Sequence, residues 1–245
     1  MTITMSDVIA TLARSPLLWM TLTLLVYLAA LWLYRRSGQN PFLIPVLTAV
    51  AVLIGVLRWS ATPYPVYFEG TTFIHFFVGP VIVALAVPLF NQLKRLKEIW
   101  LPVTVALIVG SGTAVISAVL VAWALGGSVA TLVSLAPKSA TMPIAMALAE
   151  RFNGLVALAA VAVAITGIGG TIMARPLLNL LRIQDPAVRG FSIGLTAHAI
   201  GTARAMQHSE SAGAFAALAM ALNGVATALL VPLIFWLCGR AGVLF

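Results

Sequence analysis

The sequence has very few charged residues. Only 8% of its 245 residues are Asp, Glu, Lys or Arg, whereas 62% are hydrophobic. A soluble domain typically carries about 25% charged residues. The chain therefore lacks the polar side chains needed to cover a surface that faces water. We predict an all-α integral membrane protein, a polytopic helical bundle of about seven or eight membrane segments of roughly 20 residues each.

Cysteine and acidic residues are also scarce. A single cysteine, Cys238, excludes an intrachain disulfide and a cysteine-based metal cluster. The six Asp and Glu residues are scattered, so no pair suits acid–base chemistry. Lys138 and Ser139 are adjacent and not spaced as a catalytic dyad on a helix, and no His, Cys or carboxylate set has metal-ligand spacing. We expect no enzyme activity, no metal and no cofactor.

The shortage of acid leaves a net charge of +8, from 14 Lys and Arg residues. No basic patch is interleaved with aromatic residues, which argues against nucleic-acid binding. The basic residues lie mostly between apolar runs, where the positive-inside bias explains them. The runs cover about residues 16–34, 42–58, 71–91, 100–124, 128–149, 153–181, 188–206 and 211–238.

We expect one integral membrane domain over residues 1–245. The run at 16–34 ends at Arg35-Arg36 with no small-residue cleavage site, so it is predicted to be a retained, peripheral first helix. Residues 42–240 are predicted to form the core. Residues 43–149 and 153–240 resemble each other weakly, which gives the hypothesis of an inverted repeat.

The basic residues also bear on topology. When Arg35-Arg36 is placed in the cytoplasm, Lys94-Arg95-Lys97 falls there as well. If segment 128–149 crosses the membrane, Arg182 and Arg189 fall outside, against the charge bias. We therefore favour a re-entrant hairpin for this segment. The alternative is a broken helix that crosses, with Glu150-Arg151 inside.

Residues 137–143, with the sequence PKSATMP, interrupt an apolar run with a lysine, two hydroxyls and two prolines. Buried charges and unpaired backbone groups are costly in lipid, so such a break indicates function. Ser139 and Thr141 are placed to cap a helix that restarts near Met142, and Pro143 suits its first turn. Together with Lys138, this helix start favours a bound carboxylate. The alternative is that Lys138 reaches the membrane interface from a loop end.

A second polar interruption lies at residues 196–204, with the sequence TAHAIGTAR. After Gly201, Thr202 is placed to cap a short helix, and the planar guanidinium of Arg204 suits a carboxylate. His198 is predicted to bond the solute or to carry a proton. The alternatives are an interfacial Arg204 and a buried His198 bonded to a neighbouring helix. Two such breaks predict a solute site built from discontinuous helices.

Weaker signals lie elsewhere in the chain. Gly79-Pro80 and Pro88 are predicted to kink segment 71–91 and open room for a solute, although proline is common in membrane helices. The Gly190–Gly194 spacing favours close helix packing. Asn91 and Asn223 are further candidates for a polar site.

Three motifs resemble signatures of the LrgB/CidB family. Residues 137–145, PKSATMPIA, resemble its P-K-S-[VA]-T-x-P-I-A pattern. Residues 194–205, GLTAHAIGTARA, resemble G-x-x-x-H-A-x-G-T-A-R-A, and residues 79–89, GPVIVALAVPL, resemble G-P-A-x-V-A-L-A-x-P-L. Val81 and Met142 are the departures. The resemblance covers nearly the whole chain after about residue 40.

The resemblance implies two competing functions. Bacterial members are named antiholin-like proteins or regulators of murein hydrolase export, whereas a plant chloroplast relative carries glycolate and glycerate and some bacterial members are linked to pyruvate transport. Members usually act with a smaller LrgA/CidA-type membrane partner. We favour a carrier of small 2-hydroxy or 2-oxo monocarboxylates in the bacterial inner membrane, because a pore has no evident use for Lys138 and Arg204 at two breaks. A homodimer and proton symport are expected.

Overall fold

The computed structural model describes residues 15–84 and 86–240, and every regular element within them is helical. Five helical stretches are long and apolar enough to cross a membrane: Pro16–Arg36, Thr72–Asn91, Trp100–Ala124, Val156–Leu180 and Glu210–Leu237. The predicted all-α membrane class is therefore confirmed. The total of seven or eight segments and the single membrane domain stay predictions. By packing, the described residues divide into two compact units, unit 1 with residues 15–84 and unit 2 with residues 86–240.

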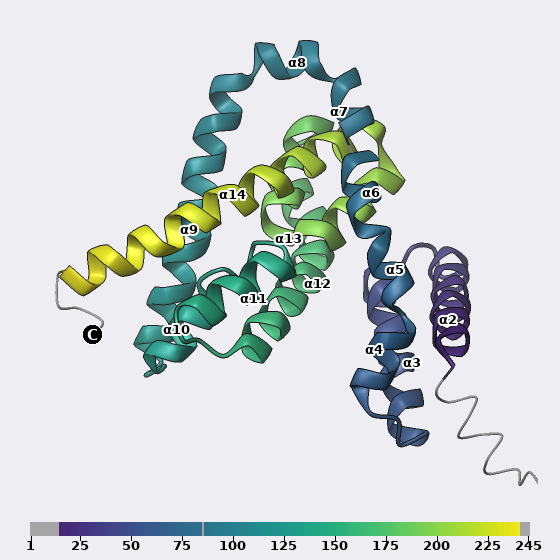
Figure 1. Cartoon of the computed structure of the whole chain (residues 1–245). Helices are drawn as coiled ribbons and strands as arrows, with labels where there is room; N and C mark the ends of the chain where they lie inside the picture. The colour runs from purple at the N-terminus through teal and green to yellow at the C-terminus, as the bar shows by residue number, and fades with distance from the viewer. Residues whose placement is uncertain (1–14, 85, 241–245) are drawn as a thin grey trace, which may run out of the picture. The chain divides into compact units, whose positions relative to one another are not determined.

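Unit 1 contains the elements α2 (Pro16–Arg36), η1 (Pro41–Leu43), α3 (Pro45–Trp59), α4 (Tyr64–Gly70), α5 (Thr72–Phe76) and α6 (Val78–Ala84) (Figure 1). The ring of Trp19 packs edge-on against Tyr67, and Thr23 shares a 3.1 Å hydrogen bond with the Tyr67 hydroxyl. These contacts hold α2 against α4. Gly79 and Pro80 lie exposed in α6, where the segment predicted at 71–91 is divided into short helices.

Unit 2 contains the two polar interruptions. Its elements are α7 (Ala86–Asn91), α8 (Leu93–Glu98), α9 (Trp100–Ala124), α10 (Val129–Leu135), α11 (Met142–Arg151), α12 (Val156–Leu180), α13 (Pro186–His208) and α14 (Glu210–Arg240). The side chain of Cys238 lies outside the described residues.

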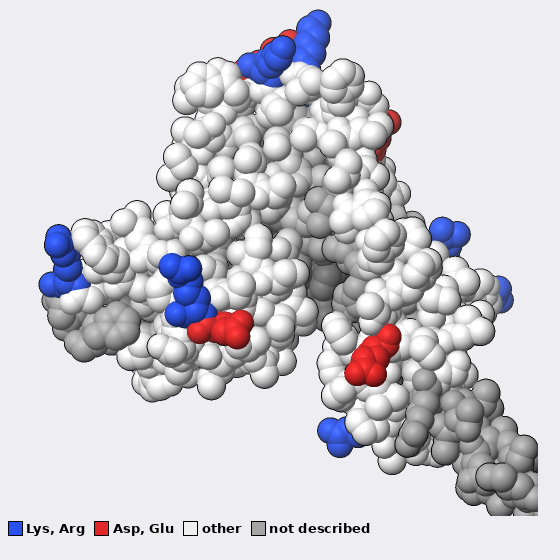
Figure 2. All heavy atoms as spheres, viewed as in Figure 1, with Lys and Arg blue, Asp and Glu red and all other residues white. Residues whose placement is uncertain are grey.

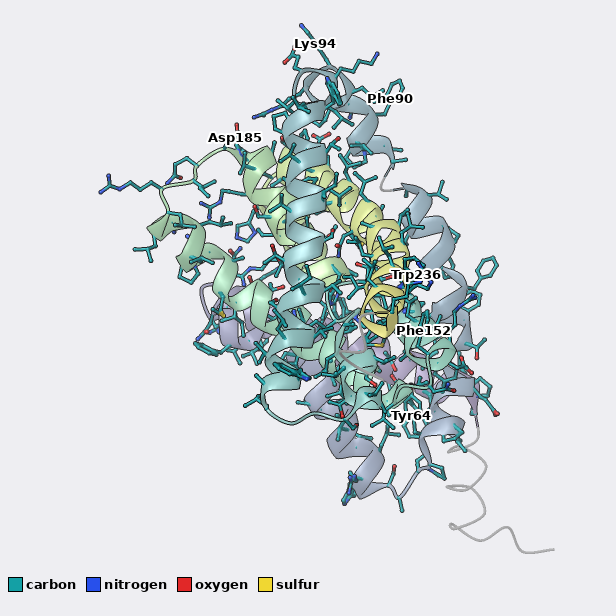
Figure 3. All side chains as sticks on the ribbon, turned by 90° about the vertical axis from the view of Figure 1, so that its left-hand side faces the viewer. Tyr64, Phe90, Lys94, Phe152, Asp185 and Trp236 are labelled. Carbon is teal, nitrogen blue, oxygen red and sulfur yellow. The ribbon has the colours of Figure 1, made fainter. Side chains whose placement is uncertain are left out.

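The long helices α9 and α14 of unit 2 run in the same direction. Ser111, in the middle of α9, bonds Asn223, in the middle of α14, and the later residues Ala122 and Phe235 share one apolar cluster. The helix α12 runs in the opposite direction. Leu155, just before α12, bonds Ser134 of α10, near the end of α9. Asp185, after the end of α12, pairs with Arg95, near the start of α9. Figure 3 accordingly places Lys94 and Asp185 toward one end of unit 2 and Phe152 and Trp236 toward the other.

The segment between α9 and α12 turns back on itself. It leaves the end of α9, reaches Ser139, whose carbonyl accepts a hydrogen bond from Asn223 in the middle of α14, and returns to Phe152, which stacks on Phe235. At the base, the Leu155 N–H donates to Ser134 Oγ at 2.7 Å. We call this element the α10–α11 hairpin. Helices of 7 and 10 residues rise only about 10 and 15 Å, so neither is long enough to cross a bilayer.

Helix α13 also turns back, at His198. The backbone there has φ 40° and ψ −132°, outside the helical region. Contacts with α12 trace the path: Arg189 bonds Asn179, His198 bonds the carbonyl of Val163, and Arg204 bonds the carbonyl of Thr171. Residues 186–197, which we call the first arm, therefore run along α12 from its C-terminal end toward its N-terminal half. Residues 199–208, which we call the second arm, run back toward the C-terminal end of α12.

The first arm of α13 packs very closely on α14. A Cβ atom added at Gly194 would lie 2.0 Å from the carbonyl oxygen of Ala216, and one at Gly190 would lie 2.1 Å from that of Ala212. Both pairs are separated by 22 residues, so these helix segments run parallel. Small residues four apart allow such backbone contact. The Gly190–Gly194 spacing was expected to permit close helix packing, and both glycines lie where the backbone of α14 leaves no room for a side chain.

Large apolar side chains cover the outside of the long helices. Ile108 of α9, Ile165 of α12 and Leu229 of α14 are more than 60% exposed. Figure 2 shows Lys and Arg gathered over α8 and an uncharged surface over much of α9 and α14. Apolar patches of this extent are typical of a surface that lipid covers.

Candidate functional site

Asn223 of α14 joins the two chain reversals. Its amide donates to the carbonyl of Ser139 at 2.8 Å and to that of Leu195 at 3.1 Å, while its oxygen accepts from Ser111 Oγ at 2.7 Å. Asn223 is 1% exposed. These bonds satisfy carbonyls that the breaks remove from helical pairing, which an apolar interior requires. The α10–α11 hairpin and the tip of α13 therefore meet at half-length of α9 and α14.

The predicted residues of the first break lie in the α10–α11 hairpin. Pro137 and Ser139 are buried, and Lys138 and Thr141 are half-buried. Thr141 occupies the N-cap position of α11 with extended backbone, but its side chain makes no capping hydrogen bond. Pro143 lies in the first turn, as expected. The first turn of α11 therefore keeps N–H groups that no side chain caps.

The second break is held by contacts with other helices. His198 is 4% exposed, and its Nε2 lies 2.9 Å from the carbonyl oxygen of Val163. The hydroxyl of Thr202 donates to the His198 carbonyl at 2.8 Å, so Thr202 bonds back one turn instead of capping the helix start. His198 is therefore buried and bonded to the neighbouring helix α12, as the alternative to a solute role expected. Its predicted role toward a solute stays a prediction.

A cavity of about 350 Å³ opens between α12 and the two arms of α13. Arg204 and Gly201 are the predicted site residues that line it. Arg175 and Arg189 line it too, and no Asp or Glu among residues 15–84 and 86–240 does. Lys138, Ser139 and Thr141 belong to the α10–α11 hairpin and are not part of this lining.

Among the residues that the structure describes, the one recorded ion pair joins Arg95 of α8 to Asp185. Lys138 and Arg204 therefore have no carboxylate partner there. Burial alone acts to raise the pKa of Asp185. The N–H groups of Val188 and Ala187 and the positive charge of Arg95 outweigh it and hold that pKa below its ordinary value. Asp185 also caps the N-terminus of α13.

Sequence reasoning gave too little weight to Asn223 and did not find Ser111, Thr171 or the cavity arginines Arg175 and Arg189. Asn223 interrupts a long apolar helix, which was its available signal. Nothing in the chain order indicates that Ser111 faces Asn223, because the two are 112 residues apart. Arg189 was used only as a charge for the topology and Arg175 lies within the apolar run 153–181, and only the reversal of α13 brings both beside Arg204.

The chain is similar to one family of membrane proteins and to several of its members. The model of the LrgB-like family matches residues 23–237. The uncharacterized protein YxaC of Bacillus subtilis is 34% identical over 88% of this chain and 94% of its own length. An uncharacterized protein of Haemophilus influenzae is 32% identical over 89% of this chain and 94% of its own. A Bacillus cereus protein named antiholin-like protein LrgB is 28% identical over 89% and 95%. No solved structure matches.

Proposed function

The chain belongs to the LrgB-like family of bacterial membrane proteins, and we propose that it carries small 2-hydroxy or 2-oxo monocarboxylates, such as glycolate, glycerate or pyruvate, across the inner membrane. One observation carries the proposal. The α10–α11 hairpin and the α13 tip meet at Asn223, and a half-helix begins at each of these reversals. Carriers commonly bind solutes near the bilayer midplane between such discontinuous helices.

Charge supports a topology for this arrangement. Lys94, Arg95 and Lys97 lie at the same end of unit 2 as the α12–α13 turn with Arg182, and the positive-inside bias assigns that end to the cytoplasm. The α10–α11 hairpin then re-enters from outside and α13 re-enters from the cytoplasm. Helices α9 and α12, 25 residues each, both precede a reversal and run in opposite directions. This order supports an inverted repeat.

The solute carboxylate supplies the missing counter-charge. Lys138 and Arg204 have no acidic partner among the described residues, and an unpaired cation is costly in an apolar environment. A negative group also interacts favourably with the uncapped first turn of α11 and with the start of the second arm of α13. Ser139, Thr141 and Thr202 contribute hydroxyl groups beside the reversals, and His198 lies at the α13 tip.

Uptake into proteoliposomes tests the proposal. Labelled glycolate and pyruvate should enter vesicles that contain the protein. Lys138→Ala and Arg204→Ala should each reduce uptake about tenfold to a hundredfold, because each removes a charged hydrogen-bond donor. Arg151→Gln, at the exposed far end of α11, is the matched control and should keep normal uptake. Normal uptake by both variants would remove the solute site from these breaks.

A second candidate function comes from the relative named antiholin-like protein LrgB. In this role the protein would regulate murein hydrolase activity by assembling with a small LrgA/CidA-type membrane partner, and its exposed apolar helices would supply the contact. Co-purification of the two proteins and cell lysis after deletion test it. Lys138→Ala and Arg204→Ala should leave assembly intact under either function. If both abolish uptake but preserve control of lysis, the two activities are separate.

A further inference from the structure

The α12–α13 cavity, the space of about 350 Å³ between α12 and the two arms of α13, carries more positive charge than a monocarboxylate needs. Within the part of the chain that the structure describes, three guanidinium groups line it, from Arg175, Arg189 and Arg204, together with His208 and no carboxylate. One monocarboxylate would neutralise one of these charges and leave two. The cavity therefore suits an anion with more than one negative charge.

Two of the three guanidinium groups are positioned by the backbone. Nη1 of Arg189 donates to Asn179 Oδ1 at 2.9 Å and to the Ile183 carbonyl at 2.8 Å. Nη1 of Arg204 donates to the Thr171 carbonyl at 3.3 Å. Each guanidinium has five N–H donors, so most remain for a ligand. Arg175 makes no recorded side-chain bond among the described residues and is exposed at the cavity.

Neighbouring acidic groups do not neutralise this charge. Asp185, which precedes the cavity residue Pro186, is occupied by Arg95 and by the N-terminus of α13. Glu210, which follows the cavity residue Ser209, accepts a hydrogen bond from the neutral amide of Asn91 and keeps its negative charge, so it offsets at most one of the three guanidinium charges. The cavity keeps a net positive charge, and planar guanidinium groups match phosphate oxygens well.

We propose that the α12–α13 cavity binds a phosphate-bearing polyanion. The chemistry fits a soluble phosphate ester or the head group of an anionic phospholipid, since basic pockets between membrane helices at the cytoplasmic face take such head groups. The site shares Arg204 with the proposed solute site but adds Arg175 and Arg189, which that function does not require. Binding of the polyanion is therefore measured apart from monocarboxylate transport.

The test uses the full-length protein in uncharged detergent micelles and follows the thermal unfolding midpoint. Inorganic phosphate and glycerol phosphate should raise the midpoint at concentrations where chloride, at equal ionic strength, does not, and a rise with glycolate should not depend on Arg175. Arg175→Gln should leave the ligand-free midpoint unchanged and weaken phosphate binding about tenfold. Arg189→Lys keeps the positive charge but loses the planar guanidinium with its paired N–H donors, and it should weaken phosphate binding about threefold. Arg151→Gln should bind as the natural protein does.

A second arm distinguishes the two sources of phosphate. The protein is placed in nanodiscs of zwitterionic lipid, with or without anionic phosphatidylglycerol. A midpoint rise with phosphatidylglycerol that Arg175→Gln abolishes identifies a lipid head group, whereas a response to soluble phosphate alone identifies a phosphate ester. Equal stabilisation by chloride, an unchanged response to phosphate in Arg175→Gln, or no response in either arm overturns the proposal. The uptake assay reports separately on monocarboxylate transport.

Discussion

The α10–α11 hairpin and α13 both turn back at Asn223, but their reversals have different causes. The turn of the α10–α11 hairpin consists of residues 136–141, and its backbone hydrogen bonds are local. The N–H of Lys138 donates to the carbonyl of Leu135 at 3.1 Å, and the N–H of Ala140 donates to that of Pro137 at 2.9 Å. Helix α13 turns at the single residue His198, whose φ is 40°. A conformation that side chains rarely adopt persists only where surrounding contacts enforce it. One reversal is therefore local and the other is imposed by tertiary structure.

Asn223 contacts both reversals, so its loss should have the largest effect. Asn223→Ala leaves two buried carbonyls without a donor, and each such group costs about 1–3 kcal/mol. We expect the free energy of unfolding to fall by about 3–4 kcal/mol, measured by thermal unfolding in detergent. Ser111→Ala removes one of the bonds and should cost about 1 kcal/mol. Equal losses in the two variants would contradict a joint role for Asn223.

The close backbone contact between the first arm of α13 and α14 has no counterpart among the described residues of the α10–α11 hairpin, and its disruption should have the next largest effect. A methyl group at Gly194 would lie 2.0 Å from the Ala216 carbonyl oxygen, so Gly194→Ala must separate the helices. We expect a loss of about 2–3 kcal/mol in unfolding free energy. Gly112→Ala is the control, because a methyl group there meets nothing within 4 Å. A stable Gly194→Ala protein would show that α13 reverses without tight packing on α14.

The packing of the His198 ring against α12 gives a third test. A methyl group at Gly167 would lie 2.5 Å from His198 Cε1, so Gly167→Ala should displace the ring from Val163 at a cost of about 2 kcal/mol. Gly169→Ala, with open space, should stabilise α12 by up to about 1 kcal/mol through helix propensity. Adding Gly167→Ala to His198→Ala should cost little more than His198→Ala alone. Full additivity would mean that the ring is not the obstacle.

The difference between the reversals also explains what the sequence could predict. Residues 137–143 contain two prolines and a lysine, so the first break was readable from neighbouring residues. The helix predicted at 100–124 matches α9, because an apolar run and its flanking signals are also local. A second break was predicted over residues 196–204, but its reversal at His198 was not, because His198 itself is neither proline nor glycine. The cause of the reversal lies in Val163, Gly167 and Asn223, which only the folded chain brings together.

The local reversal should survive the loss of a proline. Pro143 lies in the first turn of α11, where alanine is also accepted. Pro143→Ala should therefore lower the unfolding free energy by only about 0.5–1 kcal/mol, mainly through a less restricted unfolded chain. Monocarboxylate uptake should stay close to normal. A loss as large as that of Gly194→Ala would show that the first reversal depends on Pro143 and not on its turn bonds.

The bases of the two hairpins differ as well, and acid should reveal it. Phe152 and Phe235 stack at the base of the α10–α11 hairpin, whereas Asp185 and Arg95 form an ion pair at the base of α13. The pKa of Asp185 is lowered in the folded protein, so its stabilisation is present above the unfolded pKa of about 3.9 and is lost as the pH falls through the folded pKa.

Asp185→Asn keeps the capping oxygen and removes the charge, so it isolates the effect of the charge from that of the helix cap. Both side chains of the pair are more than a third exposed, which limits its contribution to about 0.5 kcal/mol. The unfolding midpoint of Asp185→Asn should lie slightly below that of the natural protein at pH 7, and the two should meet as the pH falls through the folded pKa of Asp185. High salt should narrow the gap. Glu150→Gln, an exposed acid outside any recorded ion pair among the described residues, should show no such convergence. A gap that persists in acid would assign the role of Asp185 to its helix cap instead of to its charge.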